Sequence, residues 1–306
     1  IGQVLGSMAI ENQVKGLVVG YDGRLTSPML AKSLINGILS TGCNVFEIGE
    51  VTTPMVYFAN YELKTYSGVM ITGSHNPPEY NGLKMVMAGD TLSGDKIQQI
   101  YQRIQDKQVI KGNGVHYCEN ILEAYFTKIT SDVKLARRMS IVVDAGNGVA
   151  GKIAPQLYRR LGCKVLGLFC EVDGNFPNHH PDPSKPENLN DIIHALNTTE
   201  TEIGLAFDGD GDRLGVVTKD GNIIYPDRQM MLYAADILSK NPQGKIIYDV
   251  KSSRLLADWI KENQGTPIMC RTGHSFVKAK IKETGALLAG EMSGHIFFND
   301  RWNGSD

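Results

Sequence analysis

The run Asp208-Gly-Asp-Gly-Asp-Arg213 is the densest group of side chains with evident chemistry, because three carboxylates alternate with two glycines. Carboxylates at this spacing repel one another unless a cation lies among them, and divalent cations prefer such hard oxygen ligands. The glycines allow the backbone to fold so that the three carboxylates converge. An EF-hand loop would need Gly and Glu where this sequence has Arg213 and Lys219. We therefore predict a Mg²⁺ site that bridges a phosphate, with a solvated acidic turn as the alternative.

The segment Thr72-Gly-Ser-His-Asn-Pro-Pro78 holds a hydroxyl on a loop that follows an apolar run and is stiffened by two prolines. A hydroxyl on a rigid turn can carry a group covalently, which makes Ser74 a candidate nucleophile. His75 is adjacent and can move a proton, and Lys84 can hold a phosphate as a point charge. The pattern also fits an ordinary turn or helix cap, and it is not the Gly-x-Ser-x-Gly elbow of hydrolases. A catalytic and a structural Ser74 both stay open at this point.

A third polar loop, Gly290-Glu-Met-Ser-Gly-His295, combines a carboxylate, a hydroxyl and an imidazole. Glu291, Ser293 and His295 alternate, so we expect them to share one face of an extended loop. This set suits the neighbouring hydroxyls of a sugar, although a polar loop without a ligand would look the same. Further donors for a phosphate or a sugar hydroxyl in this part of the chain are Lys251 and the run Thr272-Gly-His-Ser275.

Two other motifs favour different chemistry. The run Gly146-Asn-Gly-Val-Ala-Gly151 matches the G-x-G-x-x-G dinucleotide pattern, and Glu171 lies 20 residues beyond it. This match favours an NAD oxidoreductase, but such a site has no use for the acid triad, and the glycines also suit close helix–strand packing. The pair His179-His180 could indicate a metal site. However, adjacent side chains point apart, and the flanking prolines predict an extended connection. We expect a structural role for this pair.

Composition limits the function classes. The 306 residues are 42% apolar and 21% charged, which is typical of a globular chain of two or three domains and excludes disorder. A net charge of −2 excludes a chain-wide basic surface for nucleic acid. No apolar run reaches the roughly 18 residues of a membrane helix. Five scattered cysteines predict reduced thiols. We expect a cytoplasmic monomer or weak dimer without nucleic-acid or membrane partners.

The elements that must position these loops follow a loose threefold order. Apolar β-branched runs alternate with helix-like segments, which predicts an α/β fold. Each unit has a strand, a polar turn, a helix, a second strand and then a third strand that ends in a polar loop. The predicted strand–helix–strand–strand segments are 17–21, 27–40, 44–48 and 68–71; 141–143, 150–161, 164–169 and 203–207; and 245–248, 254–264, 267–270 and 286–289.

This order predicts three similar mixed-sheet α/β domains in tandem around a central cleft, since ligands gather outside the carboxyl ends of strands in such sheets. We place domain 1, with the serine loop, at residues 1–119. Domain 2, with the metal loop, covers 120–222. Domain 3, with the sugar-binding loop, covers 223–306 and ends before it is complete.

Taken together, the polar loops resemble the α-D-phosphohexomutase family, in particular its bacterial phosphomannomutase/phosphoglucomutase branch. The resemblance covers nearly the whole chain. The motifs that carry it are Val18-Val-Gly-Tyr-Asp-Gly-Arg24, Thr72–Pro78, Asn81-Gly-Leu-Lys84, Asp208–Arg213, Thr272–Ser275 and Gly290–His295. The resemblance implies a Mg²⁺-dependent enzyme that interconverts hexose 1-phosphate and hexose 6-phosphate of mannose or glucose, through a phosphoserine and a hexose 1,6-bisphosphate, which also serves as activator.

The same resemblance implies a role for each motif residue. Ser74 would be the phosphoserine and, with Asp208, Asp210 and Asp212, a Mg²⁺ ligand. The other catalytic positions would be His75, Lys84 and Arg213. Contacts to substrate would come from Lys251, Gly273, His274, Glu291, Ser293 and His295. Met292 is typical of the glucose/mannose enzymes, since phosphoglucosamine mutases usually have Gln there.

The sequence also departs from the family pattern. A family enzyme has an Arg-bearing segment before the position of Ile1, the remainder of domain 3 and a fourth domain with the main substrate-phosphate loop, and we expect both ends of this chain to be incomplete. The alternatives to a mutase are a Mg²⁺-dependent sugar phosphatase, an NAD oxidoreductase and, for a truncated chain, a non-catalytic module that binds hexose phosphate.

Overall fold

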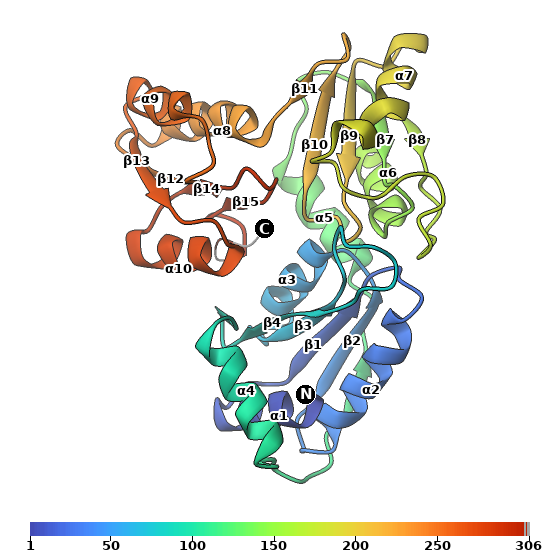
Figure 1. The fold of residues 1–306 in the computed structure, drawn as a ribbon, viewed down its shortest axis with the longest axis vertical. Helices are drawn as coiled ribbons and strands as arrows, with labels where there is room; N and C mark the ends of the chain where they lie inside the picture. The colour runs from blue at the N-terminus through green and yellow to red at the C-terminus, as the bar shows by residue number, and fades with distance from the viewer. Residues whose placement is uncertain (303, 305–306) are drawn as a thin grey trace.

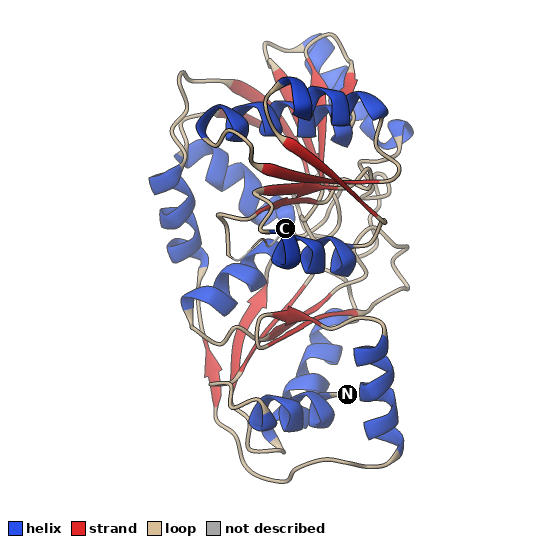
Figure 2. Cartoon of the chain, turned by 90° about the vertical axis from the view of Figure 1, so that its left-hand side faces the viewer, coloured by secondary structure: helices blue, strands red, loops and turns tan. Residues whose placement is uncertain are grey.

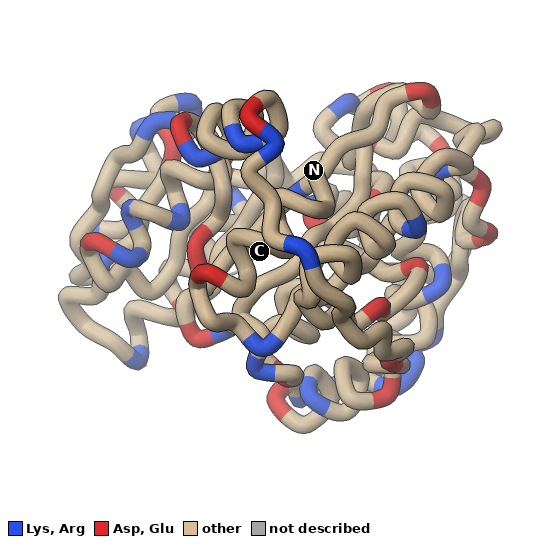
Figure 3. Tube along the Cα trace, turned by 90° about the horizontal axis from the view of Figure 1, so that it is seen from below, with Lys and Arg blue, Asp and Glu red and all other residues tan. Residues whose placement is uncertain are grey.

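The computed structural model describes residues 1–302 and 304, which form three α/β domains along the chain (Figure 1). The first domain lies at one end of the molecule, and the second and third lie side by side at the other. Lys and Arg alternate in space with Asp and Glu along the trace (Figure 3). In the described residues, no helix is long and apolar enough to cross a bilayer.

The first domain is built on a six-stranded mixed sheet in the order β5-β4-β3-β1-β2-β6. The central run Leu-Val-Val-Gly-Tyr of β1 is apolar and β-branched and is almost wholly buried, as expected for a strand covered on both faces. Its elements are α1 (Gly2–Glu11), β1 (Leu17–Tyr21), α2 (Ser27–Leu39), β2 (Val45–Glu50), α3 (Thr53–Glu62), β3 (Gly68–Ile71), β4 (Leu83–Met87), β5 (Asp90–Thr91), α4 (Asp95–Gln105) and β6 (His116–Cys118).

The second domain has a five-stranded sheet in the order β11-β10-β9-β7-β8. Its elements are α5 (Leu122–Asp132), β7 (Ser140–Asp144), α6 (Ala150–Arg160), β8 (Lys164–Leu168), the 3₁₀ turn η1 (Pro186–Leu189), α7 (Asn190–Thr198), β9 (Ile203–Phe207), β10 (Leu214–Thr218) and β11 (Ile223–Ile224). The predicted boundary after 119 falls just before α5. The boundary after 222 falls between β10 and β11, although β11 pairs with β10 in the sheet of the second domain.

The third domain has a four-stranded sheet in the order β13-β12-β14-β15. Helices α8 and α9 cover one face of this sheet and α10 covers the other (Figure 2). Its elements are α8 (Pro226–Lys240), β12 (Lys245–Asp249), α9 (Arg254–Glu262), β13 (Thr266–Cys270), α10 (His274–Thr284), β14 (Leu288–Gly290) and β15 (Ile296–Phe298).

One topology recurs in the three domains. A central strand (β1, β7 or β12) pairs in parallel with the second and third strands of its unit. The third strand then turns back into an antiparallel partner, which is β4, β10 or β15. The threefold order and the mixed sheets predicted from the sequence are therefore confirmed. The three polar loops occupy one equivalent position, the turn between the third strand and its antiparallel partner.

The first two domains share a hydrophobic core. One cluster of buried side chains joins β1 and β2 to α3, and it also contains Tyr125 and Phe126 of α5 and Ile153 of α6. The third domain has two clusters of its own, one on each face of its sheet. Buried side chains of α5 and α6 thus join domain 2 to domain 1, and the third domain adds the partly buried Trp302 to the same cluster.

Candidate active site

The metal loop lies in the tight turn between β9 and β10. Asp208 and Asp210 are fully buried and Asp212 is 8% exposed, and one carboxylate oxygen of each lies within 4.8 Å of the other two. Three buried carboxylates are costly unless a cation is near. Asp210 Oδ1 is buried without a hydrogen-bond partner in the described residues, as a coordinating oxygen would be. This donor set fits a hard divalent ion such as Mg²⁺.

The charge of this loop is partly balanced by Lys84, which lies on β4 of the first domain. Its Nζ donates to Asp210 Oδ2 at 2.6 Å and also to Asp212 Oδ2. Burial lowers the pKa of Lys84, but the nearby carboxylates more than offset this and hold it well above its usual range. Burial and the two neighbouring carboxylates raise the pKa of Asp208. Asp210 is also penalised by burial, yet contact with Lys84 brings its pKa below the usual range.

The serine loop follows β3 and meets the metal loop directly. Ser74 has a positive φ of 49°, a strained conformation for a residue with a Cβ, and it is half-buried. Its Oγ donates to Asp208 Oδ2 at 2.9 Å and lies 3.3 Å from Nδ1 of His75. Burial and the positive charge of Arg213 lower the pKa of His75. The predicted nucleophile and the predicted metal ligands are therefore in contact, although 134 residues separate Ser74 from Asp208.

Arg24 binds the backbone of the serine loop and fixes its conformation. The sequence analysis did not predict this role. Its side chain is fully buried, and its Nε donates to Asp22 Oδ2 at 3.1 Å. The same carboxylate oxygen accepts from the Thr72 hydroxyl and the Gly73 amide. The guanidinium also donates to four backbone carbonyls of the loop, those of Ser74, Asn76, Pro77 and Tyr80, at 2.5–3.0 Å. The planar fork of Arg suits such multiple recognition, and it fixes the strained loop.

Two further residues join the serine and metal loops. A Cβ on Gly209 would lie 2.4 Å from the carbonyl oxygen of Ser74, so only glycine permits this approach. Thr53, at the start of α3, donates from its backbone to the Asp210 carbonyl at 2.9 Å and from its hydroxyl to Asp210 Oδ2 at 2.5 Å. The start of α3 therefore supports the acid triad from the first domain. Sequence signals for both positions are weak, since Gly and Thr are common.

The sugar loop is not extended, so the expectation that three alternating side chains share one face was wrong. Residues 291–295 form a tight turn in which the Glu291 and Gly294 amides donate across the loop at 2.9 and 3.0 Å. Glu291 is 2% exposed and accepts from the Gly273 amide at 2.5 Å. Its carboxylate thus ties the turn to the start of α10. Ser293 Oγ is buried with no hydrogen-bond partner in the described residues.

His295 is the link between the sugar loop and the metal loop. Arg213 Nε donates to His295 Nε2 at 3.2 Å, which leaves the ring proton on Nδ1, 3.8 Å from Asp212 Oδ1. The ring of His274 packs edge-on against that of His295, with 5.2 Å between the centroids. Lys251 lies on the exposed loop after β12. The metal loop thus meets the serine loop through Asp208 and Ser74 and meets the sugar loop through Arg213 and His295. Lys251 is exposed and lies apart from these contacts.

The G-x-G-x-x-G run does not form a nucleotide cradle. The amides of residues 146–149 donate within the protein, to Asp144 Oδ1 and to the carbonyls of Phe169, Ala145 and Gly209. A Cβ on Gly151 would lie 2.2 Å from the Cys170 carbonyl, which confirms a packing role for this glycine. Because these amides already have acceptors within the protein, they are not available to bind a pyrophosphate. The dinucleotide interpretation is therefore wrong.

At least one residue of the histidine pair, His179, has the structural role that was predicted. His179 Nε2 lies 3.1 Å from Oδ2 of the fully buried Asp144, and its Nδ1 lies 2.9 Å from the His180 carbonyl. Burial lowers the pKa of His179, but its hydrogen bonds to Asp144 and to that carbonyl more than offset the penalty and raise it. The pair thus anchors the loop that packs Pro181 against the metal loop at Gly209.

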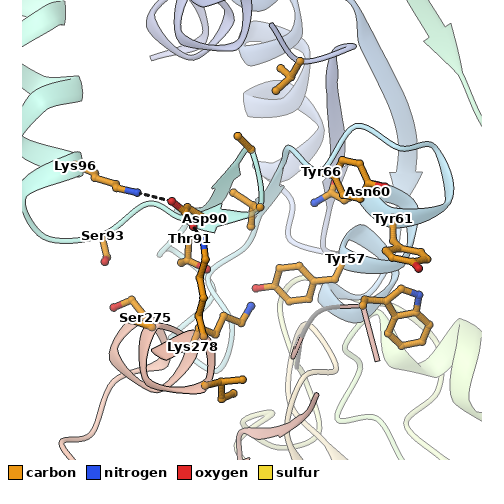
Figure 4. Close-up of a pocket in the computed structure, with 18 of the residues that line it drawn as sticks. Tyr57, Asn60, Tyr61, Tyr66, Asp90, Thr91, Ser93, Lys96, Ser275 and Lys278 are labelled. Carbon is orange, nitrogen blue, oxygen red and sulfur yellow. Dashed lines mark hydrogen bonds and ion pairs between the residues drawn. The ribbon is translucent and has the colours of Figure 1, made fainter. Parts of the chain in front are cut away.

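A groove of about 1670 Å³ separates the first domain from α10 (Figure 4). Its walls come from α3, the β4–β5 hairpin and the start of α4 on one side, and from α10 on the other. Neither Ser74 nor the three aspartates are among its described lining residues. Tyr57 belongs to the groove and its ring lies 6.3 Å from that of His274, so the groove leads toward the sugar loop.

The protein repeats one α/β topology three times, and the equivalent turn of each unit lies near the acid triad. This arrangement defines an enzyme-like class of three similar α/β domains around one site. Models of the phosphoglucomutase/phosphomannomutase α/β/α domains match this chain in order, with domain I at residues 1–110, domain II at 116–221 and domain III at 225–306. The chain belongs to this family, the α-D-phosphohexomutases.

Individual relatives agree with this assignment. The chain is 56% identical over 308 aligned residues to a phosphoglucomutase of Neisseria gonorrhoeae, and 54% identical over 306 to a phosphomannomutase/phosphoglucomutase of Pseudomonas aeruginosa. Both alignments cover 100% of this chain and 67% and 66% of those relatives, so it spans about two thirds of their length. A crystal structure of a phosphoglucomutase/phosphomannomutase family protein from Burkholderia thailandensis superposes with a TM-score of 0.97 at 52% identity, covering 100% of this chain and 68% of that one.

Proposed function

We propose that this chain acts in a phosphohexomutase that interconverts hexose 1-phosphate and hexose 6-phosphate of mannose, glucose or both. The observation that carries the proposal is the 2.9 Å contact between Ser74 Oγ and Asp208, which joins a strained hydroxyl to a buried triad suited to Mg²⁺. The named activities of relatives that are 54–56% identical support the same reaction class. Since the chain spans about two thirds of those relatives, the proposal concerns the protein to which it belongs.

In the proposed reaction, Ser74 carries the phosphoryl group that is exchanged. A sugar hydroxyl attacks the phosphorus, the bond from phosphorus to Ser74 Oγ breaks, and the hydroxyl proton passes to a neighbouring base. His75 and Lys84 are the candidates for this base, and the raised pKa of Lys84 beside the carboxylates favours His75. The hexose 1,6-bisphosphate so formed reverses its orientation and returns its other phosphoryl group to Ser74. The same bisphosphate would phosphorylate resting enzyme and so act as activator. Bound to the acid triad and to Ser74, Mg²⁺ would neutralise charge on the phosphoryl oxygens.

The remaining residues would orient the two sugar phosphates. Arg213 lies between the metal loop and His295, where its fork can contact phosphoryl oxygens. A small polar set suits two sugar orientations better than a tight apolar pocket does. The proposed sugar and phosphate contacts are Lys251, Gly273, His274, Glu291, Ser293 and His295.

The proposed setting is the cytoplasm, with the protein as a monomer or weak dimer and a hexose phosphate as its ligand. All five cysteines are free, which suits a reducing compartment. The net charge of −2 does not favour a nucleic-acid partner, and Lys and Arg lie interspersed with Asp and Glu along the trace in Figure 3.

The test is Ser74→Ala with Ser40→Ala, an exposed serine of the same domain, as the matched control. After incubation with hexose 1,6-bisphosphate and Mg²⁺, intact mass should show one added phosphoryl group on the parent and the control and none on Ser74→Ala. Turnover of hexose 1-phosphate by the protein with the full set of family domains should fall by about 10⁵-fold or more, the scale seen for loss of a nucleophile.

Other results would favour the alternatives. Stoichiometric release of inorganic phosphate from hexose phosphate would indicate a phosphatase. Binding of hexose phosphate without any phosphorylated Ser74 would indicate a non-catalytic module. Turnover of Ser74→Ala at the parent rate would overturn the serine-carrier proposal.

A further inference from the structure

A second group of metal-binding side chains lies away from the active site, at the edge of the first sheet. Glu47 of β2 and His116 and Cys118 of β6 each offer one donor atom, and these three atoms lie within 4.8 Å of one another. His116 and Cys118 are exposed and Glu47 is half-buried. Cys118 is the one exposed thiol among the five cysteines.

Strand register explains why these donors meet. Strands β2 and β6 are parallel, with Val45 opposite His116 and Glu47 opposite Cys118. Side chains alternate between faces along a strand, so positions 47, 116 and 118 share one face. The intervening residues, Phe46 and Tyr117, stack on the other face with 5.0 Å between their ring centroids. Regular backbone on two paired strands therefore fixes the donor group, without any contribution from a flexible loop.

The donors converge on one ring nitrogen. His116 Nε2 lies 2.8 Å from Glu47 Oε2 and 4.0 Å from Cys118 Sγ. A catalytic Cys–His–Glu relay would use both ring nitrogens, one for the thiol and the other for the carboxylate. Here the thiol and the carboxylate face the same nitrogen, which is the arrangement of ligands around a common centre. This geometry argues against an activated cysteine and for an ion.

From this convergence we propose that Glu47, His116 and Cys118 form a second metal site, which binds Zn²⁺ or a similar borderline cation with water as the fourth ligand. A mixed O, N and S donor set selects such ions over Mg²⁺. Around a tetrahedral Zn²⁺, bond lengths of about 2.0–2.3 Å place donor atoms roughly 3.3–3.5 Å apart. The observed 2.8 and 4.0 Å bracket these separations, so small rotations of exposed side chains suffice.

The site has a structural consequence. Strand β6 has three residues, forms the outer edge of the sheet and pairs with β2 only over 116–118. The chain continues from it into α5 and the second domain. A metal bound to both strands would pin this connection to the first domain, and binding to the folded state alone would stabilise it.

The experiment is a Co²⁺ titration of the 306-residue chain in excess Mg²⁺, followed by the thiolate-to-cobalt charge-transfer band. The acid triad has no sulfur and is invisible to this probe. We expect a band that saturates at one equivalent and is displaced by Zn²⁺. Cys118→Ser should abolish it, and His116→Ala or Glu47→Gln should weaken Co²⁺ binding by at least about tenfold, since even loss of a residue that merely supports a ligand costs 10–100-fold.

Two controls make the result decisive. Cys270→Ser removes a half-buried thiol of the third domain and should leave the band unchanged. Zn²⁺ should raise the melting temperature of the parent chain and not that of Cys118→Ser. The proposal is overturned by a missing thiolate band, by a band that survives Cys118→Ser, or by unchanged affinity in both His116→Ala and Glu47→Gln. None of these results depends on Ser74 or on mutase activity.

Discussion

The serine loop and the sugar loop occupy equivalent turns in their sheets, yet the protein holds them in different ways. The serine loop rests on the buried guanidinium of Arg24, which donates to four loop carbonyls. The sugar loop is tied within its own domain by the hydrogen bond from the Gly273 amide to Glu291. Its link to the rest of the site passes through His295 and Arg213.

The interface between domains 1 and 2 is also held by more buried contacts than the interface with domain 3. Domains 1 and 2 share a hydrophobic cluster and the buried contacts of Ser74, Thr53 and Lys84 with the metal loop. Domain 3 contacts domain 1 through the exposed ion pair of Lys282 with Asp90, through Lys278 over the Tyr57 ring at 3.9 Å, and through Trp302, whose ring centroid lies 5.6 Å from that of Phe58. Exposed pairs of this kind contribute little. The first two domains therefore form the fixed half of the site, and the third domain carries the other half through fewer buried contacts.

Among the variants that test this comparison, Arg24→Met should have the largest effect, because it removes the support of the serine loop. The change removes the buried ion pair with Asp22 and leaves four loop carbonyls without the guanidinium donor, which costs about 3–5 kcal/mol in free energy of unfolding. The relaxed loop should also slow phosphorylation of Ser74 by hexose 1,6-bisphosphate. Denaturant unfolding and the rate of phosphoenzyme formation measure the two effects.

Arg103→Met is the matched control for this change. Arg103 makes a bidentate pair with Glu11 on the surface of the same domain, which should be worth less than about 1 kcal/mol. Equal losses of stability and of phosphorylation rate in the two variants would show that Arg24 has no special part in holding the loop.

Gly209→Ala tests the contact between the serine and metal loops with a single methyl group. The φ of Gly209 is not in the left-handed region, so strain comes only from the Cβ at 2.4 Å from the Ser74 carbonyl. Forcing the loops apart should lower kcat by roughly 10²-fold, the usual scale for a shift of about 1 Å among catalytic groups. Gly82→Ala is the control, because its Cβ would find an ordinary contact of 3.4 Å. Similar kcat values for the two variants would contradict a fixed contact between the loops.

His295→Ala tests the half of the site that the third domain carries, and we expect a smaller loss of activity. The imidazole joins the sugar loop to Arg213 by one hydrogen bond, which contributes about 1 kcal/mol. The loss should appear as a rise in KM of about fivefold to tenfold, with Ser74 phosphorylation by the bisphosphate less affected than in Gly209→Ala. The exposed His194→Ala is the control. If kcat fell as much in His295→Ala as in Gly209→Ala, the two halves of the site would contribute equally to the chemical step, which would contradict this comparison.

Much of the fold was predictable, because the strands that carry the site are continuous apolar runs. The segments Gly68–Ile71 and Ile203–Phe207 were predicted with the bounds that the structure shows. Their antiparallel partners β4 and β10 were not predicted, since each is half-buried and mixes polar with apolar positions. The turn of the sugar loop was missed because its hairpin depends on β15, a strand of only three residues that was not predicted.

The site was predictable where chemistry is concentrated in one short segment. Three aspartates and two glycines in six residues predict their own convergence, but no local pattern connects Arg24 to a loop 50 residues away. A weak signal was available: Asp22 and Arg24 follow the central strand at the edge where the polar loops were expected. Gly209 could not be found from the sequence, because its importance lies in the closeness of Ser74, which only the tertiary structure defines.

The smallest expected effect on stability comes from His179→Gln. This change alters the loop that packs Pro181 against the metal loop and should leave mutase activity unchanged. The pKa of His179 is raised in the folded state, so its stabilising contribution is present below the unfolded pKa of about 6.5 and is lost as pH rises through the folded value. Glutamine can keep a neutral hydrogen bond to Asp144 but does not titrate. The parent should therefore exceed the variant by roughly 1.5–3 kcal/mol in free energy of unfolding near about pH 5.5, and by less near about pH 8.5. Denaturant unfolding at the two pH values measures the difference in free energy of unfolding, with the exposed His194→Gln as control. If the difference between parent and His179→Gln widens as pH rises, Asp144 does not hold a charged imidazole.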